Sequence, residues 1–258
     1  MDYFDQVLPT CLENWPTALA KLSIRQAGLT LSVEEAEALG TNMLELFECF
    51  EQPWARDITS IRERLARLFT EFLEGAFVRL GSRSAKDALY RKHTSLRVHN
   101  ANDALSLLLG ASERIMDDLL LAIARNYRPS ISVREWLDIP PWTEFRCFMK
   151  QRTLVGISQY FYRTVYPSLL VAAGEIEAAI RSFFPAFEQS CHIQDVVFDV
   201  VVQPSAPWEI TLLEINPYFE LTDPCLFHWQ DDDFDGGFRF GREEPPMKSA
   251  TGARLCTR

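Results

Sequence analysis

Three oxygen-bearing side chains interrupt two apolar, β-branched runs near the C-terminal end of the chain. They are Asp199, Glu214 and Asn216. The two runs predict buried strands on either side of a turn at 204–207, and an unpaired carboxylate is costly in such a strand. Carboxylate and amide oxygens are the hard ligands that Mg²⁺ takes when it is held against a nucleotide phosphate. The pattern therefore predicts an ATP-binding protein with Mg²⁺ at this hairpin.

The pairing of these strands decides whether the acids share a face. If Gln203 pairs with Trp208, Asp199 lies opposite Leu212 and Glu214 is its diagonal neighbour on the same face. A slip of one residue would turn Asp199 to the opposite face. A pair of buried carboxylates held by salt bridges is the alternative to a metal site.

A second cluster follows an apolar strand predicted at 76–80. Arg79 interrupts this strand, and the loop after it carries Ser84 and Lys86. Backbone donors, hydroxyls and cations in one loop suit phosphate oxygens. The Gly-Lys-Ser/Thr element of a Walker loop is absent. The alternative is a solvated turn beside an arginine on an edge strand.

Two further arginines, Arg134 and Arg146, stand in apolar, strand-like surroundings. A buried arginine needs a partner. Its planar fork can bind a phosphate with two hydrogen bonds, and an internal salt bridge satisfies it equally well. Trp136 is a candidate for an adenine slot, or else an aromatic residue of the core.

Other chemistry-bearing residues do not form recognisable sites. The acidic run at 231–237 begins like an EF-hand loop, but Arg242 stands where that loop needs its bidentate Glu. We therefore reject a calcium site and interpret the run as a solvated acidic segment. No serine, cysteine or histidine carries a nucleophile or zinc-ligand motif.

Composition narrows the class of protein. The chain has 258 residues, 47% of them hydrophobic, and a formal net charge of −10. This charge argues against general binding to nucleic acid or to anionic membranes, and no apolar run is long enough to span a bilayer. Six scattered cysteines lead us to expect reduced thiols and a cytoplasmic protein.

Periodicity and capping signals place the elements that carry these residues. Ser32 and Glu35 form a predicted capping box. Helices are expected at 32–52, 58–74, 101–109, 112–126 and 167 to about 184, and strands at 76–80, 130–137, 144–150 and 153–160. Early helices followed by antiparallel hairpins predict an α+β protein. We divide it into a helical region with a first lobe (1–128), a second lobe with the metal site (129–240) and a tail (241–258).

Several segments match a known family in order, from about Trp15 to Trp229. They read ENWP, FVRLGSRSAKDA, SVREWLDI, EFRCFMKQRTLVGISQYFY, VVFDVVV and EITLLEINPYFELTDPCLFHW. With these motifs the chain resembles the cell-division-cycle protein 123 family. The resemblance implies an ATP-grasp-like fold, in which two lobes with antiparallel sheets clasp ATP.

The resemblance also assigns roles by position. Arg79 takes the place of a phosphate-binding lysine, and Lys86 that of an arginine in the same loop. Arg134 and Arg146 fall where nucleotide contacts are expected. The metal positions hold Asp199, Glu214 and Asn216, and Asp223 matches the acid of a Thr-Asp element. The chain departs from the family at Gly81-Ser82, usually Asn-Trp, and at Glu214, usually Asp.

For function, the resemblance implies an ATP-binding assembly factor or chaperone for a protein client. In eukaryotic relatives this client is the gamma subunit of translation initiation factor two. An ATP-grasp ligase or a phosphoryl transferase acting on a carboxylate or hydroxyl is the alternative. A degenerate fold that binds nucleotide for stability is a third possibility, because fold resemblance does not decide among these functions.

Overall fold

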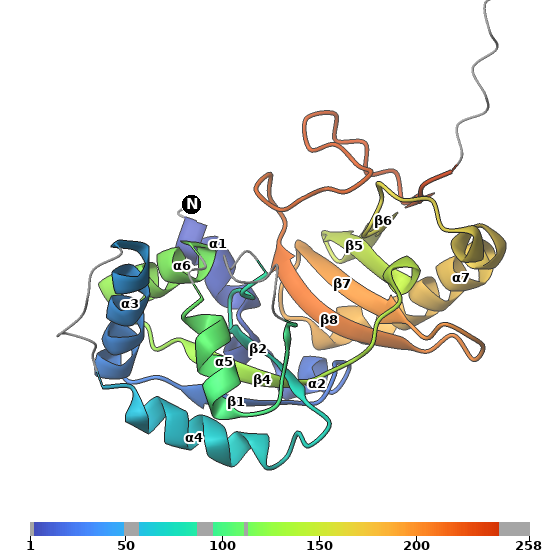
Figure 1. Ribbon diagram of the computed structural model, residues 1–258. Helices are drawn as coiled ribbons and strands as arrows, with labels where there is room; N and C mark the ends of the chain where they lie inside the picture. The colour runs from blue at the N-terminus through green and yellow to red at the C-terminus, as the bar shows by residue number, and fades with distance from the viewer. Residues whose placement is uncertain (1–2, 49–56, 87–94, 111–112, 243–258) are drawn as a thin grey trace, which may run out of the picture.

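The computed structural model describes residues 3–48, 57–86, 95–110 and 113–242, and it forms two lobes, each built on one sheet (Figure 1). The first sheet has the order β1 (Gln26–Thr30), β4 (Ser130–Glu135), β2 (Ala76–Leu80) and β3 (Arg97–Val98). The second has the order β8 (Ile210–Pro217), β7 (Val196–Val202), β5 (Glu144–Lys150), β6 (Thr153–Gln159) and β9 (Phe238–Arg239). Within these ranges β6 and β9 run parallel and the other paired strands antiparallel. The expected α+β class with two lobes is confirmed.

Helices cover each sheet. The first sheet packs against α3 (Val33–Glu48), α4 (Thr59–Phe69), α5 (Ala101–Leu108) and α6 (Glu113–Ala124), whereas α7 (Pro167–Ser190) packs on the second. The N-terminal segment holds α1 (Tyr3–Val7), the 3₁₀ turns Leu8–Thr10 and Leu12–Asn14, and α2 (Thr17–Ala20). Another 3₁₀ turn, Pro141–Thr143, leads into β5. No helix in the described ranges is both long enough and apolar enough to cross a bilayer.

The two cores do not follow the predicted division of the chain. Strand β4, assigned by sequence to the second lobe, pairs with β1 and β2 in the first sheet. Conversely, Leu12, Trp15 and Leu19 of the N-terminal segment pack into the core of the second lobe. Residues from both sides of the 128/129 boundary therefore contribute to each lobe. The predicted tail lies outside the described residues after position 242.

Local signals in the sequence set several element ends. The Ser32 backbone N–H donates to Glu35 Oε2 at 2.9 Å, and the Glu35 N–H donates to Ser32 Oγ at 3.1 Å, which confirms the capping box. The β5–β6 turn places Gln151 and Arg152 at φ angles of 49° and 60°, as a two-residue hairpin of primed type requires.

Helix α7 extends beyond its expected end because of packing against the second sheet. Pro185 lies inside the helix, which continues to Ser190. Beyond the proline, the buried ring of Phe187 stacks on Phe198 of β7 with 3.9 Å between ring centroids. The predicted end near Phe184 was wrong because this aromatic contact keeps the last turns of the helix on the sheet.

Candidate functional site

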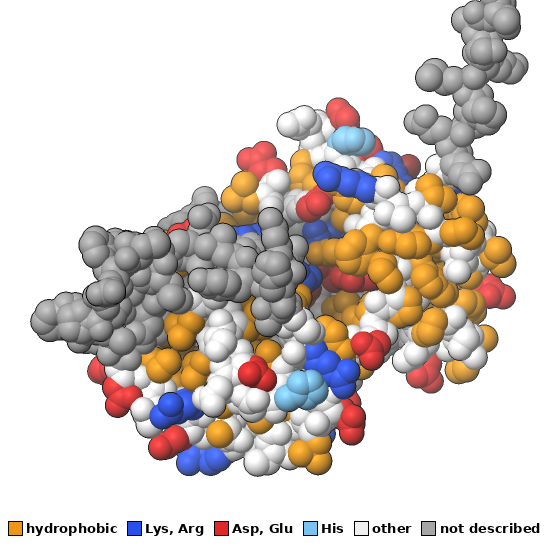
Figure 2. Space-filling model, viewed as in Figure 1, with side chains coloured by type: hydrophobic (Ala, Val, Ile, Leu, Met, Phe, Trp, Pro, Cys, Tyr) orange, Lys and Arg blue, Asp and Glu red, His pale blue; other side chains and the backbone are white. Residues whose placement is uncertain are grey.

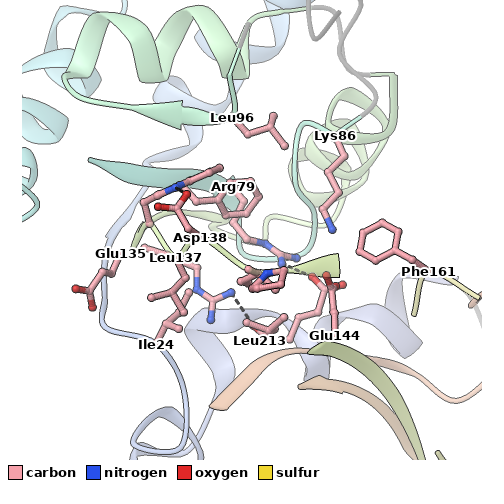
Figure 3. Close-up of a pocket in the computed structure, with 16 residues that line it drawn as sticks. Ile24, Arg79, Lys86, Leu96, Glu135, Leu137, Asp138, Glu144, Phe161 and Leu213 are labelled. Carbon is pink, nitrogen blue, oxygen red and sulfur yellow. Dashed lines mark hydrogen bonds and ion pairs between the residues drawn. The ribbon is translucent and has the colours of Figure 1, made fainter. Parts of the chain in front are cut away.

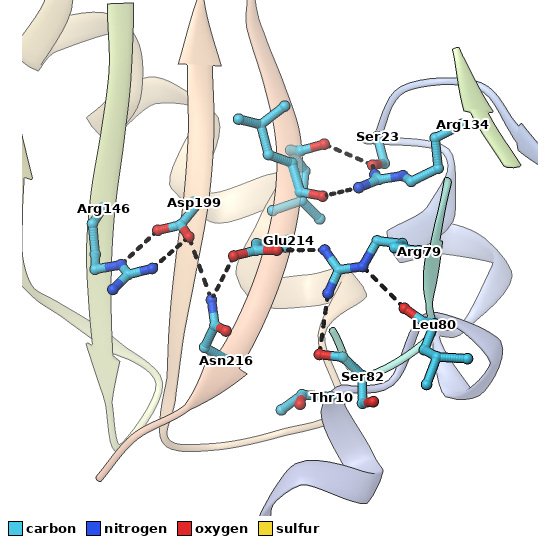
Figure 4. Close-up of polar contacts among 12 residues, drawn as sticks. Thr10, Ser23, Arg79, Leu80, Ser82, Arg134, Arg146, Asp199, Glu214 and Asn216 are labelled. Atoms are coloured by element: carbon cyan, nitrogen blue, oxygen red, sulfur yellow. Dashed lines mark hydrogen bonds and ion pairs between the residues drawn. The ribbon is translucent and has the colours of Figure 1, made fainter. Parts of the chain in front are cut away.

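The hairpin of β7 and β8 carries the three oxygen-bearing side chains (Figure 4). Asp199 pairs directly with Glu214, and a register shift then pairs Val200 with Leu212. The predicted register, with Asp199 opposite Leu212, was wrong for two reasons. At the turn Gln203 lies opposite Glu209 rather than Trp208, and the bulge then places one further residue in β8. The acids nevertheless share a face, and Asn216 Nδ2 donates to Asp199 Oδ2 at 3.3 Å and to Glu214 Oε1 at 3.4 Å.

Asp199 is the buried member of this group, with 1% of its surface exposed. Arg146 on β5 donates to its two oxygens from Nε and Nη2, both at 2.8 Å. Burial raises the pKa of the Asp199 carboxyl, and Arg146 opposes that rise. Burial lowers the pKa of the Arg146 guanidinium, but the charge and hydrogen bonds of Asp199 outweigh this effect and raise that pKa well above its usual value. The pair therefore carries both charges within the sheet.

Arg79 reaches from the first lobe to the acids of the second. Its Nη1 forms a hydrogen-bonded ion pair with Glu214 Oε2, while Nε and Nη2 donate to the carbonyls of Leu80 and Ser82, both at 3.1 Å. Burial favours a neutral Glu214, but Arg79 and Lys86 hold its pKa well below the usual value. Arg79 thus fixes the loop after β2 and connects it to the hairpin.

Arg134 also connects the lobes, but it binds a backbone carbonyl and a hydroxyl rather than a carboxylate. Its Nη1 donates to the Leu213 carbonyl at 2.6 Å and its Nη2 to Ser23 Oγ at 2.8 Å. The Nε is buried and has no hydrogen-bond partner among the described residues. Burial, with the repulsion of Arg79, lowers the pKa of this guanidinium. A ligand anion in the adjoining cleft would offset that unfavourable charge.

An apolar cavity of about 640 Å³ lies where the two lobes meet (Figure 3). Apolar side chains from both lobes line this cavity. They include Ile24, Phe77, Leu96, Leu137, Ile139, Phe161 and Leu213. The predicted residues Arg79, Lys86, Arg134 and Trp136 also line it, and Trp136 Nε1 donates to Asp138 Oδ1 at 2.8 Å. Apolar walls with a few polar groups are typical of small-molecule pockets.

A charged cavity of about 280 Å³ adjoins the first, and the two share Arg79, Lys86 and Glu214. Ser84, Arg146 and Asn216 also line it. Figure 2 shows basic and acidic side chains between the lobes on this side of the molecule. The first cavity therefore has mainly apolar walls, and the second is lined by several cations. The ion pair of Arg79 and Glu214 lies between them.

The N-terminal segment supports the loop that carries these cations. Glu13 Oε1 accepts hydrogen bonds from the Tyr127 hydroxyl at 2.9 Å and the Ser130 N–H at 3.2 Å. Glu13 Oε2 lies only 1.6 Å from the position that a Cβ at Gly81 would occupy. A Cβ at Gly81 would therefore displace the Glu13 carboxyl, a contact that strand and loop patterns did not reveal.

The predicted site residues meet in one region. Arg79, Lys86, Arg134, Trp136 and Glu214 line the apolar cavity, and Ser84, Arg146 and Asn216 line the charged one. Asp199 lies behind them, held by Arg146. Asp223 also lines the charged cavity, and its backbone carbonyl accepts a hydrogen bond from Arg146 Nη1 at 2.9 Å.

Sequence reasoning missed two residues of this region. Glu144 lines the apolar cavity, and burial raises the pKa of its carboxyl to about 7 despite Lys86 nearby. The Tyr160 ring lies between two cations, with Lys86 Nζ 5.6 Å and Arg146 Cζ 4.9 Å from its centroid. The sequence signal that could have identified Glu144 is its position as an acidic residue at the start of an apolar strand.

Comparisons with known proteins support the resemblance drawn from the motifs. The D123 family model matches residues 42–246. A translation initiation factor eIF2 assembly protein from Xenopus tropicalis is 30% identical over 165 residues, which cover 60% of this chain and 48% of that protein. The cell division cycle protein 123 of Eremothecium gossypii is 28% identical over 190 residues, covering 68% and 51% respectively. The chain thus spans about half the length of these curated relatives.

The fold has a solved counterpart. The structure of Cdc123 from Schizosaccharomyces pombe superposes with a TM-score of 0.73 and 22% sequence identity, over 88% of this chain and 90% of that one. At this identity the likeness concerns the fold alone. It confirms the expected arrangement of two lobes.

Proposed function

This chain belongs to the D123 family, and from that premise we propose that it binds Mg-ATP between its lobes and serves as an ATP-dependent assembly factor for a protein client. The observation that carries the proposal is the junction of the two cavities. An apolar cavity suits a purine base, and the adjoining charged cavity suits a phosphate chain. Arg79 and Lys86, which line both, stand where base and phosphates would join.

The cations of the junction support a phosphate ligand. Arg79 and Lys86 line both cavities, and Ser84 adds a hydroxyl on the charged side. Arg134 donates to a carbonyl and a hydroxyl and to no carboxylate in the described part of the chain. An anionic ligand would therefore reduce the repulsion between Arg134 and Arg79.

The acids of the hairpin fit a hard divalent cation. Asp199, Glu214 and Asn216 bring five side-chain oxygens to one face, and each carboxylate oxygen can accept more than one bond. Asp199 can therefore be held by Arg146 and still ligate a metal, and Glu214 and Asn216 already line the charged cavity. Magnesium bound there would neutralise phosphate charge and fix the phosphates against the hairpin.

The proposed client follows from the relatives. Proteins similar to this chain are named eIF2 assembly proteins, so we propose a protein partner and a cytoplasmic location. A ligase or phosphoryl transferase remains the competing function for the same nucleotide site. Steady release of ADP, stimulated by a small molecule from a cell extract, would favour the enzyme. Retention of unhydrolysed ATP with a co-purifying protein would favour the assembly factor.

Calorimetric titration with ATP, with and without Mg²⁺, tests the nucleotide site. Lys86→Ala is expected to weaken ATP binding about tenfold or more, because a charge-assisted phosphate contact is worth roughly 1.5–3 kcal/mol. Lys150→Ala is the matched control, since Lys150 instead pairs with Asp232 at 3.1 Å on the far end of β5. Equal affinities for the two variants would reject the site.

A further inference from the structure

The charged cavity continues away from the proposed nucleotide. Beyond it lies an outer cavity of about 770 Å³, and the two share Tyr3, Arg83, Arg114 and Leu221. None of these four lines the apolar cavity. The order along the molecule is therefore apolar cavity, charged cavity, outer cavity, with Arg83 at the second junction and Arg79 at the first.

Arg83 is held in a fixed position at this junction. Its Nε donates to Asp118 Oδ2 at 2.9 Å, and its guanidinium carbon lies 5.4 Å from the centroid of the Tyr3 ring. Asp118 on α6 is only 3% exposed, and its Oδ1 accepts from the Tyr3 hydroxyl at 3.0 Å. Two elements distant in sequence thus hold the guanidinium before any ligand arrives, which lowers the entropic cost of binding.

The Arg83 guanidinium has hydrogen-bond donors that could bind a ligand. Within the described residues Arg83 donates from Nε alone, so its two Nη groups have no protein acceptor there. Its side chain is 24% exposed, and the residue lines both cavities. The two Nη groups of an arginine form a planar fork that matches a carboxylate or phosphate.

The apolar walls of the outer cavity favour a carboxylate that carries an apolar tail over an inorganic phosphate. Leu120 and Leu221 line the cavity with exposures of 40% and 71%, and Leu121 and Ala124 of α6 add further apolar surface. An inorganic phosphate would leave this apolar surface exposed to water, whereas an aliphatic chain attached to the anion would cover it. A carboxylate with a short apolar tail therefore fits both the fork and the wall.

We propose that the outer cavity binds a small carboxylic acid with an apolar tail, its carboxylate held by Arg83 and its tail lying against α6 and Leu221. Its carboxylate would lie at the end of the charged cavity that is remote from the base. Only this position relative to the nucleotide rests on the proposed nucleotide site, because the acid itself can bind to the outer cavity without a nucleotide. It gives the molecule a second ligand, distinct from ATP and from a protein client.

The test uses hexanoate as the probe, titrated into the full chain and followed by two-dimensional NMR, with and without Mg-ADP. Hexanamide, which has the same tail without the charge, is the matched probe and is expected to bind at least about tenfold more weakly. Arg83→Gln should weaken hexanoate binding by a similar factor. Arg62→Gln, an exposed arginine of α4, should leave it unchanged.

A second variant guards against misfolding, since Arg83→Gln leaves Asp118 with fewer donors. Leu120→Ser alters an exposed side chain that lines the outer cavity and not the charged one, and it should weaken hexanoate about threefold without changing the affinity for Mg-ATP. The proposal is overturned if hexanoate and hexanamide bind equally well, or if hexanoate competes with ADP for one site. If Mg-ATP does not bind the unaltered chain while hexanoate does, only the nucleotide proposal fails.

Discussion

Arg146 on β5 and Asp199 on β7 are register partners, and the arginine donates from Nε and Nη2 to separate oxygens of the carboxylate, both at 2.8 Å. Their side chains are 7% and 1% exposed. The ion pair therefore lies inside the second sheet, and Asn216 connects it to Glu214 at the cleft. The same contacts serve the stability of the lobe and the geometry of the proposed metal site.

Removing one partner of this pair should be costly. Asp199→Ala leaves Arg146 buried without its carboxylate, and we expect a loss of about 3–5 kcal/mol in the free energy of unfolding. Urea denaturation followed by tryptophan fluorescence measures this loss. Glu220→Ala, at an exposed position, is the control and should cost less than about 0.5 kcal/mol. Similar midpoints for the two variants would contradict a structural role for the pair.

The cost should come from the unpaired charge rather than from lost volume. The double variant Arg146→Met with Asp199→Leu removes both charges of this pair, so we expect it to regain most of the stability that Asp199→Ala loses. The same urea series checks this. A double variant less stable than Asp199→Ala would mean that packing, not charge, dominates the site.

Glu214→Gln should separate metal binding from phosphate binding. The Glu214 side chain is 20% exposed at the cleft and pairs with Arg79. We expect the affinity for ATP in Mg²⁺ to fall at least about tenfold, because a neutral amide is a weaker ligand for a hard cation. Without metal, the affinity should not fall, since Arg79 is released from a competing carboxylate. Calorimetry in Mg²⁺ and in EDTA compares the two, and an equal loss in both would contradict the prediction.

The contact of Gly81 with Glu13 predicts an asymmetric response to alanine. Gly81→Ala would place a methyl group on the Glu13 carboxylate, and overpacking of this kind costs about 1–3 kcal/mol. Gly174→Ala in α7 is the matched control, because a Cβ there meets no atom within 4 Å. It should stabilise the helix by roughly 0.5–1 kcal/mol. Thermal unfolding should therefore shift in opposite directions, and parallel shifts would contradict the proposed contact.

Glu144 predicts a pH dependence of stability. Burial raises the pKa of its carboxyl from 4.5 to about 7. A carboxyl with a raised pKa in the folded state stabilises the fold while protonated, and this contribution is lost as pH rises through that value. The shift corresponds to at most about 3 kcal/mol.

Replacing the carboxyl should remove that dependence. Unfolding free energies measured from pH 4.5 to 8 should fall more steeply for the unaltered chain than for Glu144→Gln. Glu209→Gln, at an exposed position, should retain the steeper fall. If Glu144→Gln and the unaltered chain show the same slope, the pKa of this carboxyl does not differ between the folded and unfolded states, which would contradict the prediction.

Local signals in the sequence determined much of the fold. The capping box of Ser32 and Glu35, the primed turn at Gln151 and Arg152, and the limits of β2 could be predicted because each depends on neighbouring residues. The strands β1, β3 and β9 were missed. Two of them contain only two residues, and their existence depends on partners that lie far away in the chain.

The identity of the candidate site residues came from the sequence, whereas their arrangement came from the tertiary structure. Apolar runs interrupted by Asp199, Glu214 and Arg79 indicated buried charges, because burial of such groups requires a function or a partner. Only the folded chain pairs Asp199 directly with Glu214 through a bulge, and only it brings Arg79 across from the other lobe. The contact of Arg79 with Glu214 joins residues 135 positions apart, and no local pattern encodes a pairing that depends on how two lobes pack.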